Sequence, residues 1–247
     1  MKFGYEAYTY IYLTHSLLYP PFGGVLFYIG DDFMARNLPQ QLRYDKLGPN
    51  VVKALTKRHF EAYYCSTKEE ALAQAIKLIP EKDVVSWGGS ISIDEINLLS
   101  YIKEHYQVID RDSAKSPEER LDLMRKALLC DTFLMSSNAI SEDGQLVNID
   151  GNGNRVAAMI YGPKNVIIIA GMNKVVKTLD DAYARARNIA APSVVQRFPN
   201  AKTPCNQTGA CHNCLSSDSC CAYMVTTRIC RPAKKIKVIL VGENLGL

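Results

Sequence analysis

The feature that most constrains the fold of this chain is a run of β-branched apolar residues, Val166-Ile167-Ile168-Ile169, with no polar residue among them. A strand with one face in water alternates apolar and polar residues, and this run has no polar position to turn outward. Within residues 237–241, near the end of the chain, Val238 to Val241 form a similar apolar run after Lys237. Strands buried on both faces are typical of parallel sheets that helices cover on either side.

Other strands and helices alternate along the chain at the interval that such a sheet requires. Helical spacing predicts helices over about residues 42–58, 67–79, 91–99, 116–129, 156–161 and 179–189, and short apolar runs predict further strands at 60–65, 83–87, 108–109 and 132–136. Two helix starts carry specific signals, Thr67 followed by Glu70 and Ser116 followed by Pro117. The expected fold class is α/β, with a mostly parallel sheet and helices on both faces.

Residues 34–247 are interpreted as a single domain, because no linker rich in glycine and serine divides them. The preceding residues 1–33 differ in character, since no charged side chain occurs from Ala7 to Gly30. That length suits a bilayer-spanning helix, but Pro20-Pro21 and Gly23-Gly24 interrupt it at its middle. Residues 1–33 are therefore expected to be a non-native or disordered extension before Met34, with a membrane anchor as the alternative.

A glycine pair follows one predicted strand and precedes a helix, in the order Trp87-Gly88-Gly89-Ser90. Backbone amides and the helix dipole at such a position favour an anion, and ligands of open α/β sheets bind at this edge. The motif is neither a Walker loop nor a full dinucleotide fingerprint. Gly88, Gly89 and Ser90 are predicted to bind an anionic ligand, and a plain turn that needs glycine is the alternative.

The segment that follows the predicted strand at 132–136 is rich in Asn, Asp and Gly and runs as far as Arg155. Asp143-Gly144 is typical of a tight hairpin turn. Small polar side chains and bare backbone at the end of a buried strand favour a pocket rich in amide donors over a solvated loop. Arg155 suits a carboxylate or phosphate held by two parallel hydrogen bonds, although a structural ion pair fits as well. The ligand-binding residues predicted here are Asn138, Asn148, Asp150, Gly151, Asn152, Gly153 and Arg155.

Six of the eight cysteines lie between Cys205 and Cys230. A local cluster in a long chain is typical of a metal or redox site in a reducing compartment, so a cytoplasmic location is expected. Cys211 and Cys214 have the spacing with which two thiolates hold one ion. Four thiolates fit zinc or an iron–sulfur cluster, and reduced thiols without metal are the alternative. The predicted ligands are Cys205, Cys211, Cys214, Cys220 and Cys221, in a cysteine-rich insertion over residues 203–231.

The polar run, its continuation through Tyr161-Gly162-Pro163 and the strand that follows resemble the LUD domain of lactate-utilisation proteins, and the resemblance extends over residues 44–247. It implies a fold like that of the NagB, RpiA and CoA-transferase superfamily, and it favours iron–sulfur slightly because family members work beside iron–sulfur proteins. Two departures matter. Related sugar-phosphate isomerases carry an acid where this chain has Asn138, and a neutral amide is no general base. No obvious glutamate stands in the place where a CoA transferase needs its nucleophile, and Glu95 and Glu142 are candidates only by proximity in sequence.

The leading hypothesis is a LUD-type component of lactate or other organic-acid oxidation, which binds an anionic metabolite or nucleotide and has iron–sulfur oxidoreductase partners. The alternatives are an enzyme like a CoA transferase or sugar-phosphate isomerase, and a non-catalytic binding module that contains zinc. Whether the chain is an enzyme stays open, and no catalytic residue is assigned. Its net charge of +4 is spread along the chain, so neither nucleic acid nor a membrane is expected as a partner.

Overall fold

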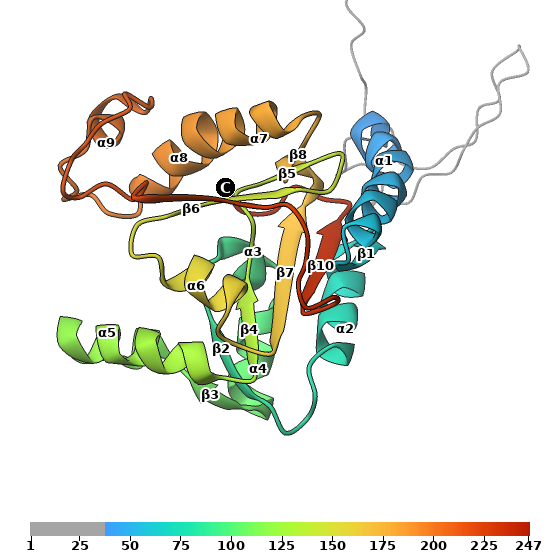
Figure 1. Cartoon of the computed structure of the whole chain (residues 1–247), viewed down its shortest axis with the longest axis horizontal. Coiled ribbons are helices and arrows are strands. Elements are labelled where there is room, and N and C mark those ends of the chain that lie inside the picture. Colours follow the sequence, from blue (N-terminus) through green and yellow to red (C-terminus); the bar gives the residue numbers. More distant parts are fainter. Residues whose placement is uncertain (1–37) are drawn as a thin grey trace, which may run out of the picture. The chain divides into compact units, whose positions relative to one another are not determined.

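A six-stranded sheet forms the centre of the computed structural model, which describes residues 38–247 (Figure 1). Its strand order is β1-β10-β7-β4-β2-β3, and every neighbouring pair is parallel. The strands are β1 (Glu61–Cys65), β2 (Val84–Trp87), β3 (Gln107–Ile109), β4 (Thr132–Met135), β7 (Asn165–Gly171) and β10 (Ile236–Val241). The prediction of an α/β fold built on a mostly parallel sheet is confirmed.

The two apolar runs form the central strands β7 and β10, and their side chains alternate between two cores. Val166 and Ile168 of β7 belong to one core, whereas Ile167 and Ile169 belong to the other. All four side chains are fully buried. Burial of one such side chain stabilises a fold by about 1.5–3 kcal/mol, so this strand favours a sheet that is covered on both faces.

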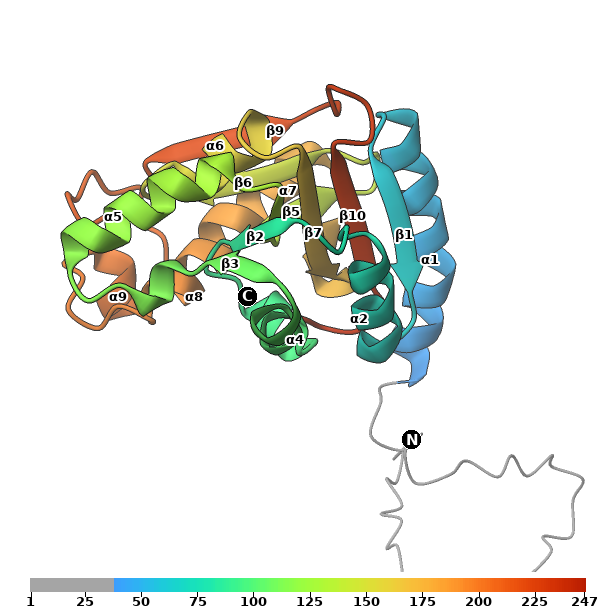
Figure 2. The ribbon, with the colours of Figure 1, turned by 90° about the horizontal axis from the view of Figure 1, so that it is seen from below.

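Helices cover one face of the sheet, and helices together with a second sheet cover the other (Figure 2). The first face packs against α2 (Lys68–Lys77), α3 (Ile91–Glu95) and α4 (Leu98–His105). The second face packs against α1 (Leu38–Lys57) and α6 (Asn154–Ile160). Between β3 and β4 the chain forms the short turn η2 (Arg111–Ser113), α5 (Pro117–Lys126) and the turn η3 (Ala127–Leu129).

The second sheet has the strand order β8-β5-β6-β9 and was not predicted. Its strands are β5 (Ala139–Ser141), β6 (Leu146–Asp150), β8 (Val175–Val176) and β9 (Tyr223–Thr227). The Asp143-Gly144 turn joins the antiparallel pair β5 and β6, as expected of a hairpin. β9 lies inside the cysteine-rich segment and pairs with β6. That pairing joins segments far apart in the sequence, so no local sequence pattern predicts it.

Two helices lie over the outer face of the second sheet in Figure 1. They are α7 (Leu179–Arg185) and α8 (Ala191–Val195), which are joined by the π-turn η5 (Ala186–Ala190). Ala182 and Ala186 pack against Val147 and Ile149 of the sheet. The predicted helix over residues 179–189 is therefore the start of a longer helical segment. The remaining short elements are η4 (Met172–Lys174) and α9 (Pro204–Thr208).

The two predicted helix starts are both present. The Oγ1 atom of Thr67 accepts the N–H of Glu70 at 3.3 Å, and the Oγ atom of Ser116 accepts that of Glu119 at 3.1 Å. The single helix expected around Ile93 to Leu99 is instead divided at Asn97, whose φ is 59°. Asparagine tolerates this left-handed conformation, so the chain turns there and begins α4.

Residues 1–33, which were expected to form an extension, lie outside the described residues. Within residues 38–247, no helix combines the length and the apolar character that crossing a membrane requires.

Candidate functional site

A cavity of about 400 Å³ lies at the carboxyl end of the large sheet. The segments that follow β2 and β4 line it, together with Lys174 beyond β7 and the end of β6. Residues of α8 and the segment after it, Ala191, Val194 and Arg197, close another side. This is the edge at which open α/β sheets bind ligands, because the loops there diverge from neighbouring strands.

Eight of the ten predicted ligand-binding residues line this cavity, and two do not. The eight are Gly88, Gly89, Ser90, Asn138, Asp150, Gly151, Asn152 and Arg155. Asn148 is fully buried, and its Nδ2 atom donates to the sulfur of Met159 at 3.7 Å. Gly153 caps the start of α6, where an added Cβ would lie 3.1 Å from the ring of Tyr223.

The glycine pair makes room for two arginine side chains. A Cβ on Gly88 would lie 2.7 Å from the Cδ atom of Arg155, and one on Gly89 would lie 2.5 Å from Nη2 of Arg111. The helix that follows, α3, has only five residues, so its dipole is weak. Positive charge at this turn therefore comes from arginine side chains rather than from the helix dipole that the sequence argument invoked.

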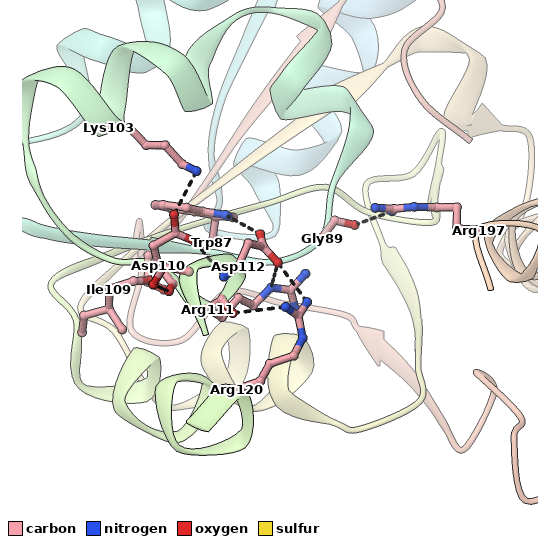
Figure 3. A network of polar contacts seen from close by, with 11 residues as sticks. Trp87, Gly89, Lys103, Ile109, Asp110, Arg111, Asp112, Arg120 and Arg197 are labelled. Carbon is pink, nitrogen blue, oxygen red and sulfur yellow. Dashed lines mark hydrogen bonds and ion pairs between the residues drawn. The ribbon is translucent and has the colours of Figure 1, made fainter. Parts of the chain in front are cut away.

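Four arginines surround the turn, and Figure 3 shows three of them beside Trp87 and Gly89. Asp112 holds two of the four: its Oδ1 atom lies 2.9 Å from Nη2 of Arg120 and 3.7 Å from Nε of Arg111. Nη1 of Arg197 donates to the carbonyl of Gly89 at 3.4 Å, a long hydrogen bond. The network comes from η2, α5 and the segment after α8, so the fold assembles it from distant parts of the chain.

The cavity carries more positive than negative side chains. Four arginines and one lysine line it (Arg111, Arg120, Arg155, Arg197 and Lys174), against three side-chain carboxylates (Asp94, Asp112 and Asp150). Burial lowers the pKa of Arg111, and the neighbouring charges of Arg120, Arg155 and Arg197 lower it further, while Asp112 opposes them. The arginines are thus close enough to repel one another, and the Nε atom of Arg111 is buried without a hydrogen-bond partner among the described residues.

Lys174 is the most deeply buried cationic side chain of the cavity, with 4% of the residue exposed. Its Nζ atom donates to Oγ of Ser92 and to Oγ of Ser136, both at 3.0 Å. Burial lowers the pKa of Lys174 to about 7; Arg185 and Arg155 add to this effect, and Glu95 opposes it. No carboxylate of residues 38–247 forms an ion pair with this amine.

Sequence reasoning missed Arg111, Arg120, Arg197 and Lys174. Two of them carry a signal that could have found them: Arg111 follows the strand ending at Ile109, and Lys174 follows the buried strand ending at Gly171. Residues that directly follow parallel strands meet at one edge of the sheet, so a basic residue at such a position is a candidate for ligand binding. Arg120 and Arg197 have no such signal, because a helix and a loop bring them to the site.

Glu95 and Glu142, the two candidates for a CoA-transferase nucleophile, do not line the cavity. Glu142 forms an ion pair with Lys177 at 2.6 Å and lines a separate surface hollow beside α1. Glu95 accepts the backbone N–H of Gly246 at 2.7 Å and does not line the cavity. Asp150 does line it, but its carboxylate accepts the N–H groups of Arg155 and Val156 at 3.0 and 3.2 Å, which caps α6.

The predicted metal ligands lie in one segment but do not converge. Cys205 is in α9, and the Sγ atoms of Cys220 and Cys221 are 3.9 Å apart. Sγ of Cys211 accepts from Arg187 at 3.9 Å. Across residues 38–247, no three His, Cys, Asp or Glu side chains are arranged to hold a metal ion. The metal site therefore stays a prediction. Cys220 also lines the cavity.

Fold and site together define an α/β protein with a cationic cavity at the carboxyl edge of a parallel sheet. The LUD domain family matches residues 49–241, and the chain belongs to that family. The family is involved in lactate utilisation generally. Among solved structures, a DUF162 family protein from Deinococcus radiodurans aligns with a TM-score of 0.48 and 11% identity, over 80% of this chain and 98% of that chain. No protein with a curated description matches this chain.

Proposed function

We propose that this protein binds an anionic metabolite, an organic acid or a nucleotide, in the cavity beside Gly88 and Gly89, as a component of lactate-type organic-acid oxidation. The observation that carries the proposal is the set of four arginines that line the cavity together with Lys174, against three side-chain carboxylates. Membership of the LUD family supports the organic-acid setting.

The energetics of burial favour a negatively charged guest. The Nε atom of Arg111 is buried without a hydrogen-bond partner among residues 38–247, which is destabilising, and a carboxylate or phosphate would supply the missing acceptor. Arginine is suited to this role because its planar group donates two parallel hydrogen bonds to such anions. The volume of about 400 Å³ also lies within the range of small-molecule sites, about 300–1,000 Å³.

Calorimetric titration tests the proposal with four probes: L-lactate, pyruvate, inorganic pyrophosphate and ATP. The informative variant is Arg197→Gln. Arg197 lines the cavity, and its hydrogen bond to the carbonyl of Gly89 is long. Loss of one charge-assisted contact weakens binding by about tenfold or more. The matched control is Arg125→Gln, since Arg125 pairs with Asp122 and 73% of its side chain is exposed.

Two results would contradict the proposal. One is that none of the four probes binds the wild-type protein at low ionic strength. The other is that Arg125→Gln weakens binding as much as Arg197→Gln, because the effect would then be one of net charge and not of the cavity.

We also propose a bound metal at the cysteine-rich segment, an iron–sulfur oxidoreductase partner and a cytoplasmic location. Support for the metal comes from the Cys211–Cys214 spacing, and support for the partner and the location comes from the LUD resemblance and the cysteine usage. Elemental analysis of protein purified without oxygen tests the metal: a visible absorption band with iron indicates a cluster, a colourless zinc-loaded protein indicates zinc, and metal-free protein contradicts the proposal.

A further inference from the structure

We infer that Lys174 is a nucleophile that forms an imine with the carbonyl group of a small anionic ligand bound in the cavity. The inference rests on the proposed function, because the arginines must hold the anionic end of that ligand. It adds a catalytic residue and a substrate class: an aldehyde or ketone that also carries a carboxylate or a phosphate.

The hydrogen bonds of Lys174 suit a neutral amine. A neutral amine has two N–H groups and one lone pair, whereas an ammonium group has three N–H groups. Nζ of Lys174 donates two bonds, to Ser92 and Ser136, both at 3.0 Å. Within residues 38–247 it has no third acceptor and no ion pair. The two donors of a neutral amine are thus used, and its lone pair is left for a carbonyl carbon.

The charges around Lys174 act mainly against protonation. Arg185 does not line the cavity, is 7% exposed, and donates hydrogen bonds to the backbone carbonyls of Asn173 and Asn138. Arg155 faces the cavity, and Glu95 is the acid that acts in the opposite sense. Burial, the largest influence, lowers the pKa of Lys174 to about 7, so a substantial fraction is unprotonated near neutral pH. Desolvation of this kind is a known way to activate a lysine.

Serine hydroxyl groups lie beside the amine that would form the imine. Lys174 and Ser136 both line it, and Oγ of Ser92 donates to Oγ of Ser136 at 3.4 Å. The Nζ lone pair attacks the carbonyl carbon, a C–N bond forms, and the C=O electron pair moves to oxygen. One amine proton passes to that oxygen, which gives a carbinolamine. The oxygen then gains a second proton from solvent, water leaves, and the nitrogen lone pair forms the C=N bond of an iminium ion. Loss of the remaining N–H proton to solvent gives the neutral imine, so no net proton is consumed.

Reductive trapping tests the inference on the full chain at neutral pH. The probes are pyruvate, which carries a carboxylate, and dihydroxyacetone phosphate, which carries a phosphate; each is added with cyanoborohydride, whose hydride reduces the C=N bond to a stable secondary amine. Peptide mapping by mass spectrometry locates the adduct, and calorimetry without reductant measures binding of the same probe in parallel. We expect the adduct at Lys174 with at least one probe, and at least a tenfold loss of labelling in Lys174→Arg.

Lys177 provides the matched control, because it lies three residues away, its side chain is 77% exposed and it pairs with Glu142. Lys177→Arg is expected to keep the adduct at Lys174. Binding without an adduct, or an adduct spread over exposed lysines with Lys174 unmodified, would overturn the inference and leave the proposed function standing. Absence of both binding and adduct would overturn both.

A second measurement covers the case in which Lys174→Arg does not fold. An excess of pyrophosphate should suppress labelling of Lys174 in the wild-type protein and leave labelling of Lys177 unchanged. Equal labelling of Lys174 with and without pyrophosphate would overturn the inference.

Discussion

At the scale of single residues, the neighbours of a side chain decide its role more than its type does. Gly88 and Gly89 were predicted to bind an anionic ligand; both line the cavity, and the space beside their backbones holds the side chains of Arg155 and Arg111. Asn148 belongs to the polar run that was expected to face a pocket, yet it points to Met159. The alternation of a strand turns successive side chains to opposite faces, so only some residues of a polar run reach one cavity.

Gly144 and Gly209 allow a test of how much a glycine contributes beyond its backbone conformation. Both have positive φ, 87° and 73°, but a Cβ at Gly144 would lie 2.7 Å from backbone atoms of Ala54 and Leu55, whereas nothing lies within 4 Å at Gly209. Gly209→Ala is expected to destabilise the fold by about 1 kcal/mol through backbone strain alone. Gly144→Ala should lower the free energy of unfolding by about 1–3 kcal/mol more, because the backbone at Ala54 and Leu55 must move to admit the added Cβ atom.

Urea denaturation followed by circular dichroism measures both variants against the wild type. Equal decreases in the free energy of unfolding of the two variants would contradict the close approach of α1 to Gly144.

At the scale of elements, helices and strands with a local signal were predictable and those without one were not. The starts of α2 and α5 follow from Thr67 and Ser116, whose oxygens accept backbone N–H groups. β9 has no comparable signal, because its partner β6 ends more than seventy residues earlier. The start of α7 is a case between the two: it has a capping box, but Asp181 takes the place that glutamate or glutamine usually holds.

The capping box of α7 should contribute measurably to stability. Oγ1 of Thr178 accepts the N–H of Asp181 at 3.1 Å, and the Asp181 carboxylate accepts the N–H of Thr178 at 3.0 Å. Thr178→Ala is expected to lower the free energy of unfolding by about 1 kcal/mol, because the helix loses a capping oxygen. Thr178→Ser keeps that oxygen and should change stability by at most a few tenths of a kcal/mol, about the spread among good caps. Similar losses in both variants, measured by thermal and urea unfolding, would argue against the cap.

At the scale of the whole molecule, the cavity exists because the fold gathers several distant segments at one edge. The large sheet supplies the turns after β2 and β4 and the residue Lys174, while the second sheet supplies the loop from Asp150 to Arg155. The helical layer over the second sheet adds Arg197 through the segment that follows α8. A site of this kind depends on the packing of all layers, so its charge is linked to the stability of the whole fold.

The dependence of stability on pH tests that link. The pKa of Lys174 falls from 10.5 to about 7 on folding, so between these values the unfolded chain binds more protons than the folded one. The free energy of unfolding should therefore rise with pH in this window, and the destabilisation is fully present below pH 7. Lys174→Met removes this contribution. Above neutrality, the free energy of unfolding of the wild type should therefore rise relative to that of the variant by up to about 1 kcal/mol per pH unit.

Urea unfolding of both proteins between pH 7 and pH 9 measures the difference. Burial raises the pKa of Cys65 to about 11 and of Cys130 to about 12, so these thiols act with the opposite sign above their ordinary pKa of 9.0. They are present in both proteins and cancel in the comparison. Parallel curves for wild type and variant would contradict the assigned shift.

The sequence by itself determined the α/β class, the buried strands, several helix starts, the β5–β6 hairpin and the family resemblance. Each of these depends on residues close together in the chain: an apolar run, a capping oxygen, or an aspartate followed by glycine. Tertiary structure alone decided the second sheet, the four-arginine network and the burial of Lys174. These depend on which distant segments meet, and on the pairing and desolvation of charges that follow when they do, which no local pattern of residues specifies.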